Sequence, residues 1–231
     1  YQLKKKMHDK FFEIARTNMV TSQILTNNVR NQKLISSIST TKKELFIPDE
    51  FFDIVYSDSD IEFSGKRKLI RTFILAKMFE KCNFLKDDSV LIIGCLSGYS
   101  MALISNMVNY VFGIENDKIL VDKANKTLSH LNFHNCSVFF KKNLSSGLSK
   151  NAPYDKIFIE GSVNFIPDDL LRQLKDDGEI FTVLENNDRN IGEFVRGVKI
   201  DSSLSFSSFF NTSVNLLPDF IIEENDYEKT F

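Results

Sequence analysis

Two kinds of hydrophobic spacing follow one another along the chain. Up to about residue 84, apolar residues recur at every third or fourth position, which is typical of amphipathic helices. This spacing predicts helices over 9–25, 29–38 and 69–84, with an irregular surface connection over 45–65. We therefore expect residues 1–84 to form an N-terminal helical cap that includes this irregular connection.

From residue 85 onward, short apolar runs alternate with helical spacing. Each short run predicts a buried strand. The predicted strands are 89–93, 110–114, 137–140, 156–159, 179–184, 193–200 and 204–210. The helices predicted between them are 99–107, 118–131 and 167–174, and a turn is predicted at Asp177–Gly178. This order predicts an α/β core over 85–231, with a mostly parallel seven-stranded sheet that ends antiparallel.

Composition narrows the class of protein. The 231 residues are 42% hydrophobic and 26% charged, which is ordinary for a globular chain. Without an internal repeat or a Pro- or Gly-rich linker, the two segments are expected to form one structural unit. A net charge of -2 argues against a general nucleic-acid binder. No apolar run reaches the roughly 18 to 20 residues of a membrane span, so no membrane partner is expected.

The cysteines give an expectation about the compartment. Cys82, Cys95 and Cys136 are far apart and odd in number, which fits neither a zinc site nor a disulfide framework. A cytoplasmic protein in a reducing compartment is therefore expected. The sequence does not indicate an oligomeric state.

The candidate ligand site lies at the first strand–helix junction, from Gly94 to Tyr99. In an open parallel sheet, ligands bind outside the carboxyl ends of the strands, where a glycine turn meets a helix. Glu115 lies 21 positions after Gly94 at the end of the next predicted strand, where its carboxylate can accept hydrogen bonds from a ribose. We expect a nucleoside-sized hollow at this bend. The alternative is a plain tight turn beside a solvated Glu115.

The turn reads Gly-Cys-Leu-Ser-Gly, and its composition bears on the ligand. It lacks the second close glycine of a dinucleotide site and has no basic residue for a pyrophosphate. A nucleoside without phosphates, S-adenosylmethionine, is therefore favoured over NAD(P).

Several blocks of sequence resemble the protein-L-isoaspartate O-methyltransferase family. They are Ala15–Ile24, Lys43–Pro48, Tyr56–Asp58, Val90–Tyr99, Glu115, Ala152–Asp155 and Leu216–Phe220. The resemblance covers nearly the whole chain, and its C-terminal block is most similar to divergent alphaproteobacterial members. It implies a Rossmann-like class I methyltransferase that uses S-adenosylmethionine to methylate the side-chain carboxylate of L-isoaspartyl (D-aspartyl) residues. The implied partners are isoaspartyl-containing proteins or peptides, whose ester collapses to a succinimide and so repairs the backbone.

This chemistry asks little of catalytic side chains, because a carboxylate is already a nucleophile and a sulfonium already a good leaving group. The resemblance implies cofactor contacts from Gly94, Cys95, Ser97, Gly98, Tyr99 and Glu115, with Asn143 or Leu144 near the adenine. It places the acceptor beside residues 58–72, and the candidate catalytic residues there are Asp58, Lys68 and Thr72.

Three positions depart from the family pattern. Ile70 stands at the serine of the acceptor segment, Ile92 at the acidic residue that ends the first strand, and Leu96 at the middle glycine of the turn. A loss of about 2 to 3 kcal/mol at the last two would weaken cofactor binding roughly a hundredfold. These departures keep two alternatives open: a catalytically impaired binding module, or a methyltransferase with a different acceptor.

A local basic cluster follows the irregular connection and consists of Lys66, Arg67, Lys68 and Arg71. It is either a partner for a substrate carboxylate or phosphate, or a solvated face. His130 and His134 straddle a predicted helix end without a carboxylate or cysteine at metal spacing, so both are expected at the surface and no metal site is expected.

Overall fold

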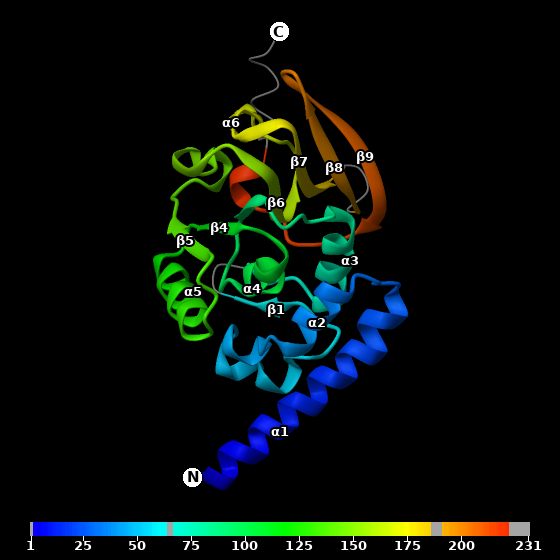
Figure 1. Cartoon of the computed structure of the whole chain (residues 1–231), viewed down its shortest axis with the longest axis vertical. Helices are drawn as coiled ribbons and strands as arrows, with labels where there is room; N and C mark the ends of the chain where they lie inside the picture. Colours follow the sequence, from blue (N-terminus) through cyan, green and yellow to red (C-terminus); the bar gives the residue numbers. More distant parts are fainter. Residues whose placement is uncertain (1, 64–66, 186–190, 222–231) are drawn as a thin grey trace.

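A seven-stranded sheet organises the chain in the computed structural model, which describes residues 2–63, 67–185 and 191–221 (Figure 1). The strand order is β5-β4-β3-β6-β7-β8-β9. Strands β3 to β7 pair in parallel, whereas β8 is antiparallel to both of its neighbours. The strands are β3 (Ser89–Ile93), β4 (Tyr110–Glu115), β5 (Cys136–Phe140), β6 (Tyr154–Val163), β7 (Leu174–Glu185), β8 (Gly192–Ile200) and β9 (Ser203–Thr212). The predicted α/β class and antiparallel end are confirmed.

Helices cover both faces of this sheet. Alternate residues of β3 enter different apolar clusters, because successive side chains of a strand point to opposite faces: Ile92 joins the larger cluster and Ile93 the smaller one. The larger cluster takes buried side chains from α3 (Thr72–Cys82), α4 (Tyr99–Ile104) and α5 (Lys118–His130). The smaller one takes them from η7 (Leu144–Ser146), α6 (Asp168–Arg172) and η9 (Pro218–Phe220). Two further 3-10 turns are η6 (Ser105–Met107) and η8 (Ser149–Asn151).

The N-terminal region is helical, as predicted, and packs on the larger cluster. Its elements are α1 (Gln2–Met19), a π-helical turn η1 (Val20–Ile24), η2 (Leu25–Asn27), α2 (Gln32–Thr40), η3 (Lys43–Leu45) and η4 (Asp49–Ile54). The start of α1 projects away from the body in Figure 1. Because Met19, Leu34 and Phe46 share one cluster with the sheet residues, the N-terminal elements and the sheet have a continuous core.

A buried polar network fastens α1 to the segment after α2. The Arg16 guanidinium donates to the Tyr56 hydroxyl at 2.9 Å and lies 3.5 Å from the Glu44 carboxylate. Tyr56 in turn donates to Glu44. Burial raises the pKa of the Tyr56 hydroxyl, and its hydrogen bond to Glu44 raises it further. Burial of a charged pair is tolerated here because each member has hydrogen-bond partners.

The predicted third helix begins later than its spacing suggests. Strand β2 (Lys68–Leu69) pairs with β1 (Ile61–Glu62) in a small antiparallel sheet, so α3 starts at Thr72 and not at residue 69. This two-stranded sheet carries Arg67 toward the main sheet.

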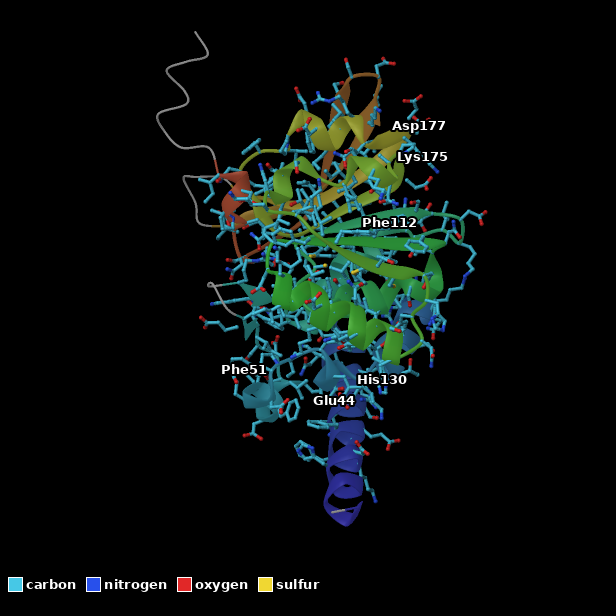
Figure 2. All side chains as sticks on the ribbon, turned by 90° about the vertical axis from the view of Figure 1, so that its left-hand side faces the viewer. Glu44, Phe51, Phe112, His130, Lys175 and Asp177 are labelled. Atoms are coloured by element: carbon cyan, nitrogen blue, oxygen red, sulfur yellow. The ribbon has the colours of Figure 1, made fainter. Side chains whose placement is uncertain are left out.

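The predicted turn at Asp177–Gly178 does not precede a strand but interrupts one. These residues lie inside β7, where the pairing with β6 jumps from Tyr154↔Leu174 to Lys156↔Glu179. Asp177 has φ 60°, the left-handed conformation that turns and bulges share. The signal therefore marks an irregularity within a strand, on the outer part of the molecule where Figure 2 places Lys175 and Asp177.

The last described segment returns to the centre of the sheet after β9. Ser162 of β6 donates through its backbone N–H to Asn215 O at 2.8 Å and accepts from the Leu217 N–H at 3.0 Å. Its hydroxyl lies 3.1 Å from Val214 O. This return places Pro218 and η9 beside the carboxyl ends of the parallel strands. Among the described helices, none is long and apolar enough to cross a membrane.

Candidate functional site

The site is built around the turn between β3 and α4. Gly94 and Gly98 have φ of 76° and 83°, a region that residues with a Cβ enter only at a cost. The backbone N–H of Gly94 donates to Ile114 O at 2.9 Å, and the N–H of Gly98 closes the turn on Cys95 O at 2.8 Å. The predicted glycine turn therefore joins the end of β3 to the end of β4.

Glu115, the last residue of β4, is fully buried against this turn. One carboxylate oxygen accepts from the Leu96 N–H at 2.9 Å, and the other accepts from the Asn116 N–H at 2.8 Å. The acidic group predicted for a ribose therefore stands beside the turn, and it is not a solvated strand end.

The side chain of Arg67 reaches the same carboxylate. Its Nη1 lies 3.2 Å from Glu115 Oε1 and its Nη2 lies 3.4 Å from Oε2. Nη2 also donates to Gly94 O at 3.0 Å, and a Cβ placed on Gly94 would lie only 2.8 Å from that nitrogen. The Arg67 guanidinium therefore occupies the space that a side chain at position 94 would fill.

A pocket of about 540 Å³ opens beside this pair. It lies next to the carboxyl ends of β4 and β5, the edge at which parallel sheets bind ligands, and its volume is suitable for a nucleoside. Its lining consists of Arg67, Glu115, Asn116, Asp117, Lys118, Leu120, Phe140 and Pro218. Apart from Glu115, none of these was a predicted cofactor contact. The ends of two predicted strands would have pointed to Asn116 and Phe140.

None of the other predicted cofactor residues lines this pocket, so the hollow expected at the bend of residues 94–98 lies instead beside the ends of β4 and β5. Asn143 caps η7 by accepting from the Ser145 N–H at 2.9 Å, and the buried Leu144 donates its N–H to Asp219 at 2.8 Å. Cys95 and Tyr99 are buried, and burial raises the pKa of both side chains. Cys95 packs within the larger apolar cluster, and its raised thiol pKa argues against a reactive thiolate.

The predicted acceptor residues lie in different environments. Asp58 and Lys68 are exposed, and Lys68 is the first residue of β2. Thr72 is buried at the start of α3, where its hydroxyl accepts from Lys43 Nζ at 3.0 Å. The fully buried Lys43 was not a predicted site residue, and burial lowers its pKa to about 8, while the negative charge of Asp60 acts in the opposite direction. Of the three predicted side chains, two are therefore exposed and one is buried.

The three departures from the family pattern also have defined places. Ile70 and Ile92 are buried members of the larger apolar cluster. The side chain of Leu96 joins the same cluster and does not line the pocket. The backbone of Leu96 has a φ of 47°, which is unusual for leucine. Its backbone N–H is what contacts the site, through Glu115.

Glu160, on β6, is a polar residue of the site that the sequence did not single out. It is buried, and its Oε2 accepts from the Ser100 hydroxyl at 2.5 Å. Burial raises the pKa of this carboxyl to about 7. The hydrogen bond from Ser100 and the positive charge of Arg67 act in the opposite direction. Within the described part of the chain, Glu160 Oε1 and the Ser97 hydroxyl are buried without a hydrogen-bond partner.

The remaining members of the basic cluster behave differently from Arg67. Lys68 is exposed, Arg71 lies 3.5 Å from Asp60, and Lys66 lies outside the described residues. The histidines His130 and His134 are exposed, His130 at the end of α5 (Figure 2). No group of three His, Cys, Asp or Glu residues that could hold a metal was found in ranges 2–63, 67–185 and 191–221.

Comparison with known proteins assigns this architecture to a family. The family model described as protein-L-isoaspartate(D-aspartate) O-methyltransferase matches residues 15–207. This chain belongs to that methyltransferase family. A family member named protein-L-isoaspartate O-methyltransferase 2, from Shewanella sediminis, is 32% identical over 74% of this chain and 70% of its own length. A second, from Syntrophus aciditrophicus, is 26% identical over 84% of this chain and 88% of its own.

Solved structures of methyltransferases share the fold of this family member. One, a protein-L-isoaspartate O-methyltransferase, has a TM-score of 0.73 at 19% identity and covers 91% of this chain, which spans 65% of that protein's length. A Plasmodium falciparum protein assigned to the same family, solved in complex with S-adenosyl-L-homocysteine, has a TM-score of 0.74 at 16% identity and covers 88% of this chain and 98% of its own. These similarities confirm the Rossmann-like class I methyltransferase fold.

The family uses S-adenosylmethionine, and the residues of this methyltransferase fit that cofactor. The pocket lies at the correct edge of the sheet and has room for an adenosyl group. The unpartnered Ser97 hydroxyl and Glu160 oxygen add polar groups around the turn that a polar ligand can satisfy. Glu115 borders the pocket, although Arg67 contacts both of its oxygens.

Proposed function

We propose that this chain transfers a methyl group from S-adenosylmethionine to the side-chain carboxylate of L-isoaspartyl (D-aspartyl) residues in damaged proteins. The observation that carries the proposal is the family match over residues 15–207, which includes both the turn and Glu115. The resulting ester collapses to a succinimide, which repairs the backbone. Isoaspartyl-containing proteins or peptides are therefore its partners.

The residues proposed to hold the cofactor are those of the turn and the pocket. Glu115 would accept from the ribose hydroxyls, Ser97 and the backbone of Gly94–Gly98 would hold the polar chain, and Phe140 would pack against the base. When bound, S-adenosylmethionine supplies a methyl group on a sulfonium, a leaving group that a carboxylate displaces without a general base. The protein's contribution is to orient the acceptor and exclude water.

The acceptor side is proposed to lie on the segment from Asp58 to Thr72, within the N-terminal 84 residues. Lys68 stands exposed on this segment and can attract an anionic peptide. The carboxyl of Glu160 is proposed to lie near the acceptor oxygen. In its protonated form it does not repel that anion, and its pKa of about 7 keeps it partly protonated at neutral pH.

A test of this function compares two peptides of identical composition, one with an L-isoaspartyl and one with an L-aspartyl residue. With methyl-labelled S-adenosylmethionine, the isoaspartyl peptide is expected to gain a base-labile methyl ester and the aspartyl peptide none. The matched control is Glu115→Gln, which removes the proposed ribose acceptor charge and is expected to raise the cofactor concentration needed for half-maximal rate.

Binding of S-adenosylmethionine without ester formation on either peptide would contradict the acceptor and favour a methyltransferase with another substrate. The different environments of Asp58, Lys68 and Thr72 favour this second candidate. Failure to bind at millimolar cofactor would favour a non-catalytic binding module.

A further inference from the structure

The carboxylate of Glu115 has no free acceptor position in this structure. A carboxylate offers about four lone-pair sites. Glu115 Oε1 accepts from Asn116 N–H and Arg67 Nη1, and Oε2 accepts from Leu96 N–H and Arg67 Nη2. Two of these four donors are backbone groups of the turn and strand end, whereas the other two come from one side chain. Only Arg67 can leave without remodelling the sheet.

Arg67 is held firmly where it is. Its side chain is 9% exposed, and Glu115 is 1% exposed, so their charges attract each other with little screening by water. The third hydrogen bond, to Gly94 O at 3.0 Å, fixes the plane of the guanidinium over the turn. A charge-assisted, two-point contact of this kind is stronger than hydrogen bonds from neutral hydroxyls.

The pair also borders the pocket. Arg67 and Glu115 both line the cavity of about 540 Å³. A ligand that enters the cavity and donates hydrogen bonds to Glu115 therefore finds Arg67 already bound to that carboxylate. A ribose offers two neutral hydroxyl donors, which replace the charged fork of Arg67 only at a cost in affinity.

From these contacts we infer that Arg67 competes with the ribose of the cofactor for Glu115 and sets the affinity of the enzyme for S-adenosylmethionine. Cofactor binding displaces the guanidinium from both carboxylate oxygens. This inference rests on the proposed function, because S-adenosylmethionine is the cofactor assigned there. It adds a residue that opposes cofactor binding.

The test measures the affinity for S-adenosyl-L-homocysteine by calorimetry in the wild type and in Arg67→Met. Methionine keeps an apolar stem but offers no donor to Glu115. We expect Arg67→Met to bind at least tenfold more tightly, about 1.4 kcal/mol. Equal or weaker binding by Arg67→Met would overturn the inference.

Arg16→Met is the matched control, because Arg16 also forms a buried pair with a glutamate, Glu44, outside the pocket lining. It controls for the general loss of stability when a buried ion pair is broken, and its affinity should equal that of the wild type. Melting curves establish that each variant is folded. Where Arg67→Met does not fold, Arg67→Lys decides: a single ammonium cannot bridge both oxygens and Gly94 O, so its affinity should still exceed that of the wild type.

A second comparison separates competition at Glu115 from simple blocking of space. Adenosine and 2′,3′-dideoxyadenosine differ only in the ribose hydroxyls. Arg67→Met should gain affinity for adenosine and not for the dideoxy analogue, whereas an equal gain for both would contradict competition.

The methyl-transfer assay at saturating cofactor distinguishes failure of this inference from failure of the proposed function. Tighter binding by Arg67→Met without methylation of isoaspartyl peptide upholds the inference and rejects the function. Methylation of the isoaspartyl peptide, together with an unchanged affinity of Arg67→Met for the ligand, upholds the proposed function and rejects the inference. Absence of binding by both proteins at millimolar ligand rejects both.

Discussion

Glu160 couples the stability of the molecule to pH. Its pKa is about 7 in the folded chain against an ordinary value of 4.5, so between these values the folded chain holds a proton that the unfolded chain has released. The free energy of unfolding should therefore fall as pH rises from 4.5 to 7, by about 3 kcal/mol for this group at 1.36 kcal/mol per pKa unit. In Glu160→Gln this contribution should vanish, as measured by urea denaturation across that range.

The hydrogen bond from Ser100 offers a control for this pH effect. Because the Ser100 hydroxyl lowers the pKa of Glu160, Ser100→Ala should extend the fall in stability above pH 7. An identical pH slope in the wild type and Glu160→Gln would contradict the assignment to Glu160.

Lys43 should produce a pH effect of opposite sign. Burial lowers its pKa from 10.5 to about 8, so between these values the unfolded chain holds the extra proton. Stability should therefore rise with pH from 8 to 10.5, and Lys43→Met should remove that rise. Lys43→Met should also be more stable than the wild type at pH 7, since a buried ammonium costs about 3 kcal/mol there. Chemical denaturation of both proteins at pH 7 and pH 10 checks this, and a less stable Lys43→Met at pH 7 would contradict it.

At the scale of single residues, the sequence located the turn and Glu115, because a glycine turn after a strand and an acidic residue at the next strand end have fixed places in a parallel sheet. It could not pair Arg67 with Glu115, since the two lie 48 positions apart and spacing alone does not bring them together. Glu160 and Lys43 could not be predicted as site residues, because glutamate and lysine side chains are ordinarily exposed, whereas both are buried here.

Two helix caps offer a comparison at the scale of elements. The Asp117 carboxylate accepts from the N–H groups of Ile119 and Leu120 at the start of α5, beside the pocket. Asn31 caps α2 in the same way, on Lys33 and Leu34, and it is not among the pocket residues. Each change to alanine should lower the free energy of unfolding by about 1 kcal/mol.

Only the cap beside the pocket should matter for the ligand. Asp117→Ala should weaken binding of S-adenosyl-L-homocysteine by about fivefold, equivalent to about 1 kcal/mol, because it loosens the start of α5. Asn31→Ala should bind as the wild type does. Thermal melts and calorimetry measure the two effects, and equal affinities for both variants would show that the α5 cap does not support the site.

The elements themselves were largely predictable. Strand β3 has the predicted bounds, Ser89–Ile93, because four consecutive apolar residues that end at a glycine are typical of a buried parallel strand. The bulge in β7 was missed, since Asp177–Gly178 satisfies the rules for a turn and only pairing with β6 keeps the strand continuous. The start of α3 was misplaced for a similar reason: β2 pairs with a strand earlier in the chain.

At the scale of the whole molecule, the pocket depends on the return of the chain to β6. A Cβ on Gly161 would lie 2.8 Å from Asn215 O, in the segment that leads to Pro218. Gly161→Ala should therefore push that segment outward, lower stability by about 1 to 3 kcal/mol and weaken binding of S-adenosyl-L-homocysteine.

Gly178→Ala is the matched control, because its Cβ would also lie 2.8 Å from a backbone oxygen, that of Lys175, in the bulge of β7. It should lose similar stability and keep its affinity. Calorimetric titration of both variants decides the matter, and a Gly161→Ala protein with wild-type affinity would show that the returning segment does not shape the pocket.

The same return has a consequence during synthesis. Arg67 and Glu115 leave the ribosome early, but Pro218, the last residue of the pocket wall, follows more than a hundred positions after Glu115. A nascent chain can complete its parallel strands while this wall is still missing. Tight capture of the cofactor should thus begin only after Pro218 has left the ribosome, so that the ligand stabilises chains with a complete pocket wall in preference to shorter ones.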